Sequence, residues 1–236
     1  MTRNLKKIVV VLMALALVVI AASFIYAKVI NKADDEFDSS DVKDRLTTTT
    51  ADATGATNAT DSGSVDGAWL IAEGSEVGYR IEESISGFDT TANGRTTAIT
   101  GRFTIAGPVV TAGEFTVDMT KFSSDEGRRD SAFNSRIMEV STFPTAIFVL
   151  TEQIEFGEVP TDGATITATA TGDLTLHGVT KSVTFLVEAT FQSGRVGVLG
   201  QIPIVFADYD ISDPSFASVR TDDNGLLEFV LIFDRA

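Results

Sequence analysis

An alternation of apolar and polar residues runs from Gly67 to the end of the chain and constrains the fold more than any other feature. In one stretch, Val183 and Phe185 alternate with Ser182 and Thr184. Successive side chains of a β-strand point to opposite faces, so this pattern predicts strands with one buried and one solvated face. Glycine-containing breaks recur at hairpin-like intervals, and no long run has the helical period. The pattern predicts an all-β fold, either an antiparallel sandwich or a closed barrel.

One segment of this region lacks the alternation. Residues 125–138 place Phe133, Ile137 and Met138 near helical spacing. We expect a short helix or an ordered loop here, as a connection that covers one end of the barrel.

The first 30 residues have the composition of a membrane anchor. No charged residue occurs from Ile8 to Ala27, and a helix of that length would cover the roughly 30 Å of a hydrocarbon core. Arg3, Lys6 and Lys7 precede the stretch, and basic flanks favour the cytoplasmic side. We therefore expect one transmembrane helix in the cell membrane with the C-terminal bulk on the extracytoplasmic side.

A cleaved signal peptide, with secretion of the mature chain, is the alternative. Ile25-Tyr26-Ala27 has some likeness to a cleavage site, but the apolar run is longer than the roughly 7 to 15 residues of an ordinary signal sequence. An uncleaved anchor is the favoured interpretation.

Residues 31–66 read as a linker between the anchor and a domain at 67–236. The segment is acidic and then rich in Thr, Ala, Asp and Gly, and few large apolar side chains are available for burial. Such a composition does not offset the entropy of ordering the chain. We expect a flexible tether that lets the domain move some tens of ångströms from the bilayer.

Composition excludes several classes of function. The net charge of -15 disfavours nucleic acid as a partner. The absence of Cys removes disulfides and thiolate metal sites, and the single His, His177, leaves no His-rich metal site. The five aspartates from Asp208 to Asp223 lack the spacing of a calcium loop and are expected to be solvated. We expect no metal, no cofactor and no catalytic residue.

Several separated motifs resemble one family. They are RRDSAFNSRIMEVSTFPTAIF at 128–148, GDLTLHGVTKSVTF at 172–185, EGSEVGYRI at 73–81, Trp69, and the pieces IPIVFADYDI, PSF and DDNGLLEFVLIF within 202–233. In this order and spacing they are similar to the YceI-like lipid/polyisoprenoid-binding family. The resemblance covers essentially all of 67–236.

The resemblance implies an extended antiparallel barrel of lipocalin-like shape whose interior holds a long isoprenoid or other lipid. It also implies an exported or membrane-tethered binding protein without an established catalytic residue. Where the family commonly has a His two positions after Arg-Asp in the first motif, this chain has Ala132. Any role of that His in binding a head group is absent here.

The residues themselves support a barrel interior rich in apolar side chains. Fourteen of the 16 Phe residues lie after residue 66, and a barrel of about eight strands either fills its lumen with side chains or holds one small ligand. The expected lumen residues share inward positions on the strands: Tyr79, Ile81, Phe103, Phe115, Val117, Phe148, Ile166, Ala168, Phe185, Val187, Phe206 and Phe229. The same aromatic residues would also suit a filled core.

Few polar residues stand out as candidates for the mouth of the barrel. Arg129 and Asp130 are adjacent in the non-alternating segment, where they form either a loop-ordering pair or a place for a lipid head group. His177 is expected in a hairpin turn, exposed or locally hydrogen-bonded, and Asp173 and Lys181 are expected to form an ion pair across that hairpin.

The predicted function is that of a membrane-tethered protein that stores or transports an isoprenoid or other long-chain lipid in its lumen. Three alternatives are an enzyme that acts on a lipid head group, a filled-core surface interaction domain, and a haem carrier. A haem carrier would need an axial ligand such as His177, Tyr79 or Tyr209.

Overall fold

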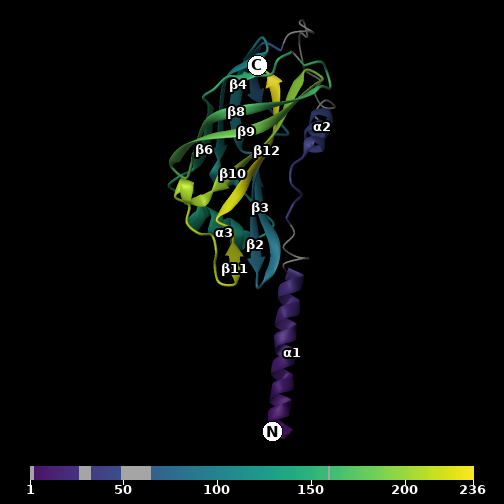
Figure 1. Ribbon diagram of the computed structural model, residues 1–236, viewed down its shortest axis with the longest axis vertical. Coiled ribbons are helices and arrows are strands. Elements are labelled where there is room, and N and C mark those ends of the chain that lie inside the picture. Colours follow the sequence, from purple (N-terminus) through teal and green to yellow (C-terminus); the bar gives the residue numbers. More distant parts are fainter. Residues whose placement is uncertain (1–2, 27–32, 49–64, 159) are drawn as a thin grey trace.

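The computed structural model describes residues 3–26, 33–48, 65–158 and 160–236 of the 236-residue chain. An apolar helix, α1 (Arg3–Ile25), stands apart from a β-barrel and points away from one end of it (Figure 1). We call the barrel end next to α1 the lower end and the opposite end, where the C-terminus lies, the upper end.

Eight antiparallel strands form the closed barrel. Its strands are β1 (Gly67–Ile71), β4 (Ile99–Ala106), β5 (Val109–Asp118), β6 (Thr145–Leu150), β8 (Thr165–Leu176), β9 (Val179–Gln192), β10 (Arg195–Val205) and β12 (Asn224–Arg235). They pair in this order, and β12 pairs with β1 to close the sheet, with Trp69 opposite Arg235. The expected antiparallel barrel is confirmed.

The last barrel strand has two partners on the same edge. Its C-terminal part pairs with β1, and its N-terminal part pairs with β2 (Glu76–Ile85), which in turn pairs with β3 (Phe88–Thr96) and β11 (Val219–Thr221). At the switch, the buried Ser75 hydroxyl accepts from Ile232 N at 2.8 Å and lies 3.1 Å from Ile232 O. A short strand, β7 (Ile154–Glu155), is added beside β5.

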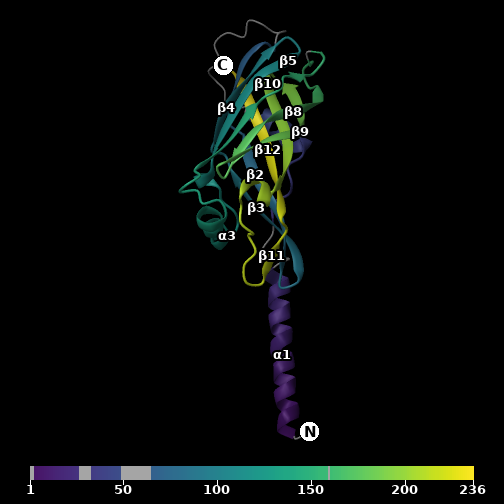
Figure 2. The same ribbon diagram turned by 60° about the vertical axis from the view of Figure 1, so that its left-hand side comes forward.

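Short helices cover the lower end of the barrel. These are η3 (Met119–Lys121), α3 (Gly127–Ala132), η4 (Phe133–Ile137) and η5 (Phe206–Tyr209). The Phe133 ring from η4 stacks on Tyr79 of β2 with 4.9 Å between ring centroids. The expected helical connection within 125–138 is confirmed, and Figure 2 shows α3 against the side of the barrel near β11 and β3.

Part of the expected linker is ordered, so the prediction of a flexible tether is wrong for residues 33–48. Within this segment α2 (Ser39–Thr48) lies against the outside of β10 and β12, with Phe37, Val42 and Leu46 buried. Gly197 of β10 has no Cβ, and a Cβ there would collide with Val42. This notch in the barrel wall admits the helix, although the sequence around it is strongly polar. Most of residues 49–66 lies outside the described part of the chain.

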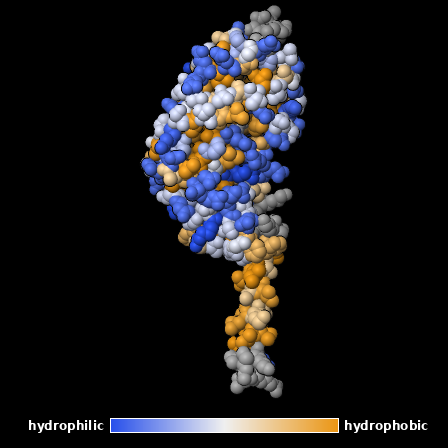
Figure 3. Space-filling model, in the orientation of Figure 1, coloured by the Kyte–Doolittle hydropathy of each residue, from blue (hydrophilic) through white to orange (hydrophobic). Residues whose placement is uncertain are grey.

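The α1 helix is long and apolar enough to span a membrane. The qualifying stretch runs from Lys7 to Ile25, and none of it is buried against the rest of the protein. Figure 3 shows it as a hydrophobic stalk below a barrel surface of mixed and mostly hydrophilic character. An anchor and a signal sequence both have these properties.

Candidate functional site

Two cavities lie in the barrel, one above the other. The upper cavity, of about 190 Å³, is bordered by β4, β5, β6, β8, β9, β10 and β12 and includes Phe103 and Phe233 at its far end. The lower cavity, of about 250 Å³, is bordered by β2, the helices α3 and η4, and the segment from η5 to β11. Each exceeds the roughly 150 Å³ of an engineered apolar cavity that admits benzene.

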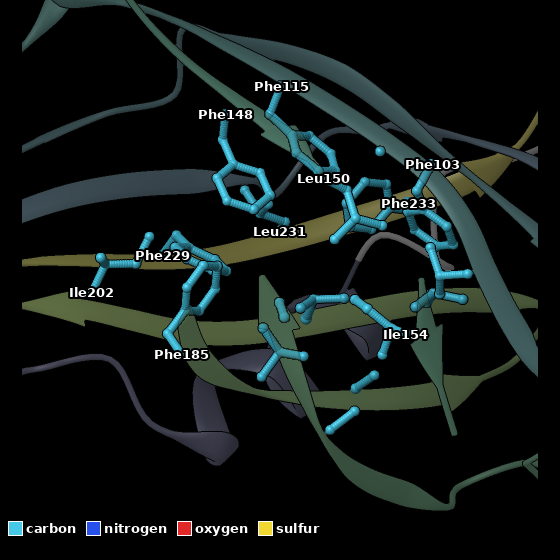
Figure 4. A pocket seen from close by; sticks show the side chains of 18 of the residues that line it. Phe103, Phe115, Phe148, Leu150, Ile154, Phe185, Ile202, Phe229, Leu231 and Phe233 are labelled. Atoms are coloured by element: carbon cyan, nitrogen blue, oxygen red, sulfur yellow. The ribbon is translucent and has the colours of Figure 1, made fainter. Parts of the chain in front are cut away.

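Every described residue that lines the upper cavity is apolar. Phe115, Phe148, Phe185 and Phe229 turn their rings toward it from four different strands (Figure 4). Phe148 and Phe185 meet edge to face with 5.5 Å between their centroids. A space of this kind excludes water and favours hydrocarbon, because burying apolar surface is favourable and no polar group needs a partner there.

All twelve residues expected in the lumen border one of the two cavities. Nine of them, among them Ile166, Ala168 and Val187 on β8 and β9, line the upper cavity. Tyr79, Ile81 and Phe206 line only the lower one. On β8 the alternation holds residue by residue: Thr165, Thr167 and Thr169 are exposed. That these residues bind a ligand stays a prediction.

Glycines opposite aromatic residues help to keep the interior open. Gly94 of β3 lies directly across from Tyr79, and a Cβ there would approach the Tyr79 ring to 2.6 Å. Gly200 of β10 bears the same relation to Phe229 of β12. Because the glycine has no side chain, each ring lies back over the neighbouring strand and does not project fully into the lumen.

Four residues border both cavities, and we call this boundary between them the neck. They are Val77 of β2, Val117 of β5, Ala146 of β6 and Leu227 of β12. Val117 and Ala146 are cross-strand neighbours. Ala146 has the smallest of the four side chains.

The lower cavity carries charged groups at its rim. The Arg129 guanidinium lines it and pairs with Asp125 and with Glu83, the latter at 3.8 Å. Asp130 does not pair with its neighbour Arg129 in this way, and its carboxylate accepts from Ser124 N at 2.8 Å and Ser124 Oγ at 2.7 Å. Of the two expected mouth residues, Arg129 borders the cavity and Asp130 orders the loop beside it.

Tyr79 is a buried phenol at the boundary between the apolar lumen and this charged rim. Burial raises the pKa of Tyr79 well above its usual value, while the nearby Arg129 guanidinium opposes the rise. The phenol is therefore neutral at physiological pH, as expected for a group against an apolar cavity.

His177 lies apart from both cavities. It occupies the β8–β9 turn at φ 50°, which confirms a turn position, but the side chain is buried and not exposed. Its Nδ1 lies 3.1 Å from the Tyr209 carbonyl oxygen, its Nε2 lies 3.6 Å from Glu139, and its ring packs on Phe143. These contacts hold one end of the hairpin in place. Of the three candidate axial ligands of haem, His177 and Tyr209 border neither cavity, whereas Tyr79 lines the lower one.

The prediction of an ion pair between Asp173 and Lys181 is wrong, because the register of the two strands differs by one residue from the expected one. Lys181 lies opposite Leu174, while Asp173 lies opposite Ser182. Neighbouring residues in a strand face opposite sides, so Asp173 and Lys181 are diagonal and point to different faces. The Lys181 ammonium is instead 3.8 Å from Asp208.

Sequence reasoning missed four residues that shape the lower rim: Tyr26, Glu126, Arg136 and Phe216. Tyr26 follows α1 and donates to Glu126 Oε2 at 3.1 Å, while the Arg136 guanidinium donates to the Pro214 carbonyl at 2.8 Å. The helical segment around Glu126 and Arg136 was a usable signal for this end of the barrel. The contact from Tyr26 was not, because it joins residues 100 positions apart.

Two curated proteins are similar to part of this chain in sequence. A UPF0312 protein of Pseudomonas putida is 34% identical over 133 residues, which are 52% of this chain and 65% of that protein. A UPF0312 protein of Vibrio parahaemolyticus is 33% identical over 104 residues, 40% of this chain and 50% of the relative. This chain thus matches less than two thirds of the length of these relatives.

Two solved structures have the same fold. A polyisoprenoid binding domain from Saccharophagus degradans superposes with a TM-score of 0.58 at 16% identity, over 72% of this chain and 99% of that one. BcnA of Burkholderia cenocepacia superposes with a TM-score of 0.53 at 18% identity, over 67% and 95% of the two chains. At these identities the likeness concerns the fold. The model of the YceI-like domain matches residues 69–233, nearly the whole barrel, and the chain therefore belongs to the YceI-like domain family.

Proposed function

We propose that this protein holds an isoprenoid or other long-chain lipid inside its barrel, as a store or carrier anchored to the membrane by α1. One observation carries the proposal: a wholly apolar upper cavity adjoins a lower cavity with a charged rim, and four residues border both. This gradient of polarity fits a molecule with a hydrocarbon tail and a polar head. The tail would occupy the upper cavity and the head would lie near Arg129.

The energetics favour such a ligand over a polar one. Each Å² of apolar surface removed from water contributes about 25 cal/mol, so a chain enclosed on all sides gains affinity in proportion to its length. A polar ligand in the upper cavity would lose its hydrogen bonds to water without finding partners among the apolar side chains that line it.

Binding is supported over catalysis by the state of the rim carboxylates. Glu83 pairs with Arg129, and the Glu126 carboxylate accepts from Arg128 N at 3.1 Å and from the Tyr26 hydroxyl. Both groups have structural partners, whereas a general acid or base needs to face the reacting atom. The cavities also count against the filled-core interaction domain, because a filled barrel would leave no apolar cavity of this size.

The basic residues in the first turns of α1, Arg3, Lys6 and Lys7, support an extracytoplasmic position for the barrel. Short segments rich in Lys and Arg stay on the cytoplasmic side of a membrane. Retention of α1 would then make the protein single-pass, with the barrel outside.

The test enlarges a small lumen residue and its outward neighbour on the same strand. Ala168→Phe should occupy the upper cavity and abolish lipid that copurifies with the full-length protein, as measured by mass spectrometry of organic extracts. Thr169→Phe, which faces solvent, should retain the lipid. Because the cavity provides space, the melting temperature of the delipidated Ala168→Phe protein should stay close to that of wild type.

Two results would contradict the proposal. Unchanged lipid in Ala168→Phe would mean that no chain passes this strand. A loss of stability of roughly 1 to 3 kcal/mol in the delipidated variant, with no lipid in wild type, would indicate an overpacked, filled core.

A further inference from the structure

The end of α1 touches the lower end of the barrel. The Tyr26 hydroxyl donates to Glu126 at 3.1 Å, and Phe24 meets Phe88, the first residue of β3, edge to face with 5.5 Å between the ring centroids. Tyr26 immediately follows the apolar stretch that ends at Ile25. Tyrosine is enriched at the membrane–water interface, so Tyr26 marks the level at which a spanning α1 would leave the bilayer.

The segment before α2 is fixed to the barrel wall just above this point. The Arg80 guanidinium donates to the Asp34 carbonyl at 2.6 Å, and Phe37 N donates to the fully buried Glu228 carboxylate at 3.2 Å. The Arg95 guanidinium lies 3.9 Å above the Phe37 ring centroid and 3.3 Å from Glu228. We call residues 33–48 the strap, because these contacts attach the segment to the barrel wall.

Covalent geometry then limits the distance between membrane and barrel. Tyr26 and Asp34 are eight residues apart, and eight residues reach at most about 28 Å when fully extended. With the strap docked, the barrel cannot move away as a domain on a long tether would, and its lower end stays near the bilayer.

The lower end presents an exposed apolar side chain beside the lower cavity. Phe216, which bridges to Val219 at the start of β11, is 71% exposed, more than any other large apolar residue in the described barrel. Phe216 and Tyr26 both border the lower cavity, and β11 lies at the α1 end in both ribbon views (Figures 1 and 2).

We propose that the lower end of the barrel docks on the surface of the bilayer, and that a lipid enters the lower cavity directly from the membrane between Tyr26 and Phe216. This rests on the proposed function, since it requires a retained α1 and a lipid ligand. Phe216 enters the interfacial layer, where an aromatic ring is favoured. The lipid then reaches the apolar lumen without crossing water.

The chain has no Cys, so single cysteines can be labelled. Ser218→Cys places a bimane beside Phe216 on an exposed position, and Ala112→Cys places one on exposed β5 near the upper end. Full-length protein is reconstituted into phosphatidylcholine vesicles with doxyl-labelled lipid, and N-terminal sequencing verifies that α1 is retained. We expect several-fold stronger quenching at position 218 than at position 112.

A strap variant tests the cause of this orientation. In the Ser218→Cys protein, Leu46→Ala should release the strap and reduce quenching toward the level at position 112. Lys43→Ala, on the exposed face of the same helix, should leave quenching unchanged. Emission from the single Trp, the buried Trp69, reports whether the barrel stays folded.

Equal quenching at positions 218 and 112 would overturn the docking proposal. Quenching at 218 by a doxyl-labelled second copy of the chain, and not by doxyl lipid, would instead identify an interface between copies. Lipid content is measured on the same preparations. Lipid present without preferential quenching contradicts only the docking, whereas preferential quenching without bound lipid contradicts the proposed function.

Discussion

The two cavities differ in what surrounds them. The upper cavity is enclosed by barrel strands and packed aromatic rings, and Trp69 lies behind it, stacked on Phe103 at 6.2 Å and edge to face with Phe191 at 6.3 Å. The lower cavity is bordered by strands, chiefly β2, and also by short helices and loops, which are joined by polar contacts such as those of Arg136 with the Asp213 and Pro214 carbonyls. A regular sheet thus surrounds the apolar upper cavity, whereas irregular segments, which are in general less rigid, contribute to the border of the lower cavity that we propose as the entrance.

The largest effect should come from removing the aromatic support of the upper cavity. Trp69 is 1% exposed, and its Nε1 donates to the Val65 carbonyl at 2.9 Å. Trp69→Ala should lower the free energy of unfolding by about 3 to 5 kcal/mol, as for other buried aromatic residues. For Phe216→Ser at the lower end, the free energy of unfolding should stay within about 0.5 kcal/mol of the wild-type value. Urea denaturation followed by circular dichroism measures the free energy of unfolding of both variants. Equal losses of stability would contradict the proposed difference between the upper and lower ends.

A second change separates the cavities at the neck. Ala146→Phe should fill the space between Val77, Val117 and Leu227, so that a long chain no longer crosses from the lower to the upper cavity. Affinity for long-chain lipids should fall about tenfold or more, equivalent to about 1.4 kcal/mol, while short chains still bind in the lower cavity.

Titration with fluorescent lipids of increasing chain length measures this effect. Thr145→Phe, at the exposed neighbouring position on β6, is the matched control. Loss of all chain lengths alike in Ala146→Phe would mean that the two cavities do not act as separate compartments.

The smallest effect concerns the charge that caps α3 at the lower rim. The Arg128 N–H, and then the Tyr26 hydroxyl, lower the pKa of Glu126 by favouring its charged form. Its contribution to stability is therefore present above the ordinary Glu pKa and is lost as pH falls through the lowered value in the folded protein. Glu126→Gln should remove this contribution, which is below about 1 kcal/mol at so exposed a site.

The measurement is the difference in urea midpoint between wild type and Glu126→Gln at pH 7 and at pH 3. The difference should shrink at pH 3. The control variant Glu152→Gln, on an exposed loop, should have the same urea midpoint as wild type at both pH values. A difference that grows toward pH 3 would reverse the assigned sign.

The lumen could be predicted from the sequence because strand periodicity is a local property. Once Thr165, Thr167 and Thr169 are assigned to the solvent face, Ile166 and Ala168 must face the interior. The sequence pattern indicated a break at Gly94, but this residue lies within β3 opposite Tyr79. That Gly200 makes room for Phe229 depends on the register between β10 and β12, which are separated along the chain.

The strap and the neck could not be predicted, because each depends on long-range contacts. Val42 and Leu46 are four residues apart, as on one face of a helix, but their polar surroundings masked this signal. Their partner, the notch at Gly197, lies about 150 residues later. The ion pair at the β8–β9 hairpin failed for a related reason: a shift of one residue in register moves a side chain to the other face.

The pairing of β1 with β12 has a consequence for how the protein is made. Trp69 lies opposite Arg235, so the seam joins the first and last strands of the barrel. Contacts between residues so distant in sequence form slowly, because the intervening chain must first be ordered. During synthesis the lumen therefore does not exist until β12 has emerged, and the apolar faces of the other strands stay accessible until then. A chaperone that shields hydrophobic strands should accelerate maturation, and the lipid of the proposed function would be acquired only after closure.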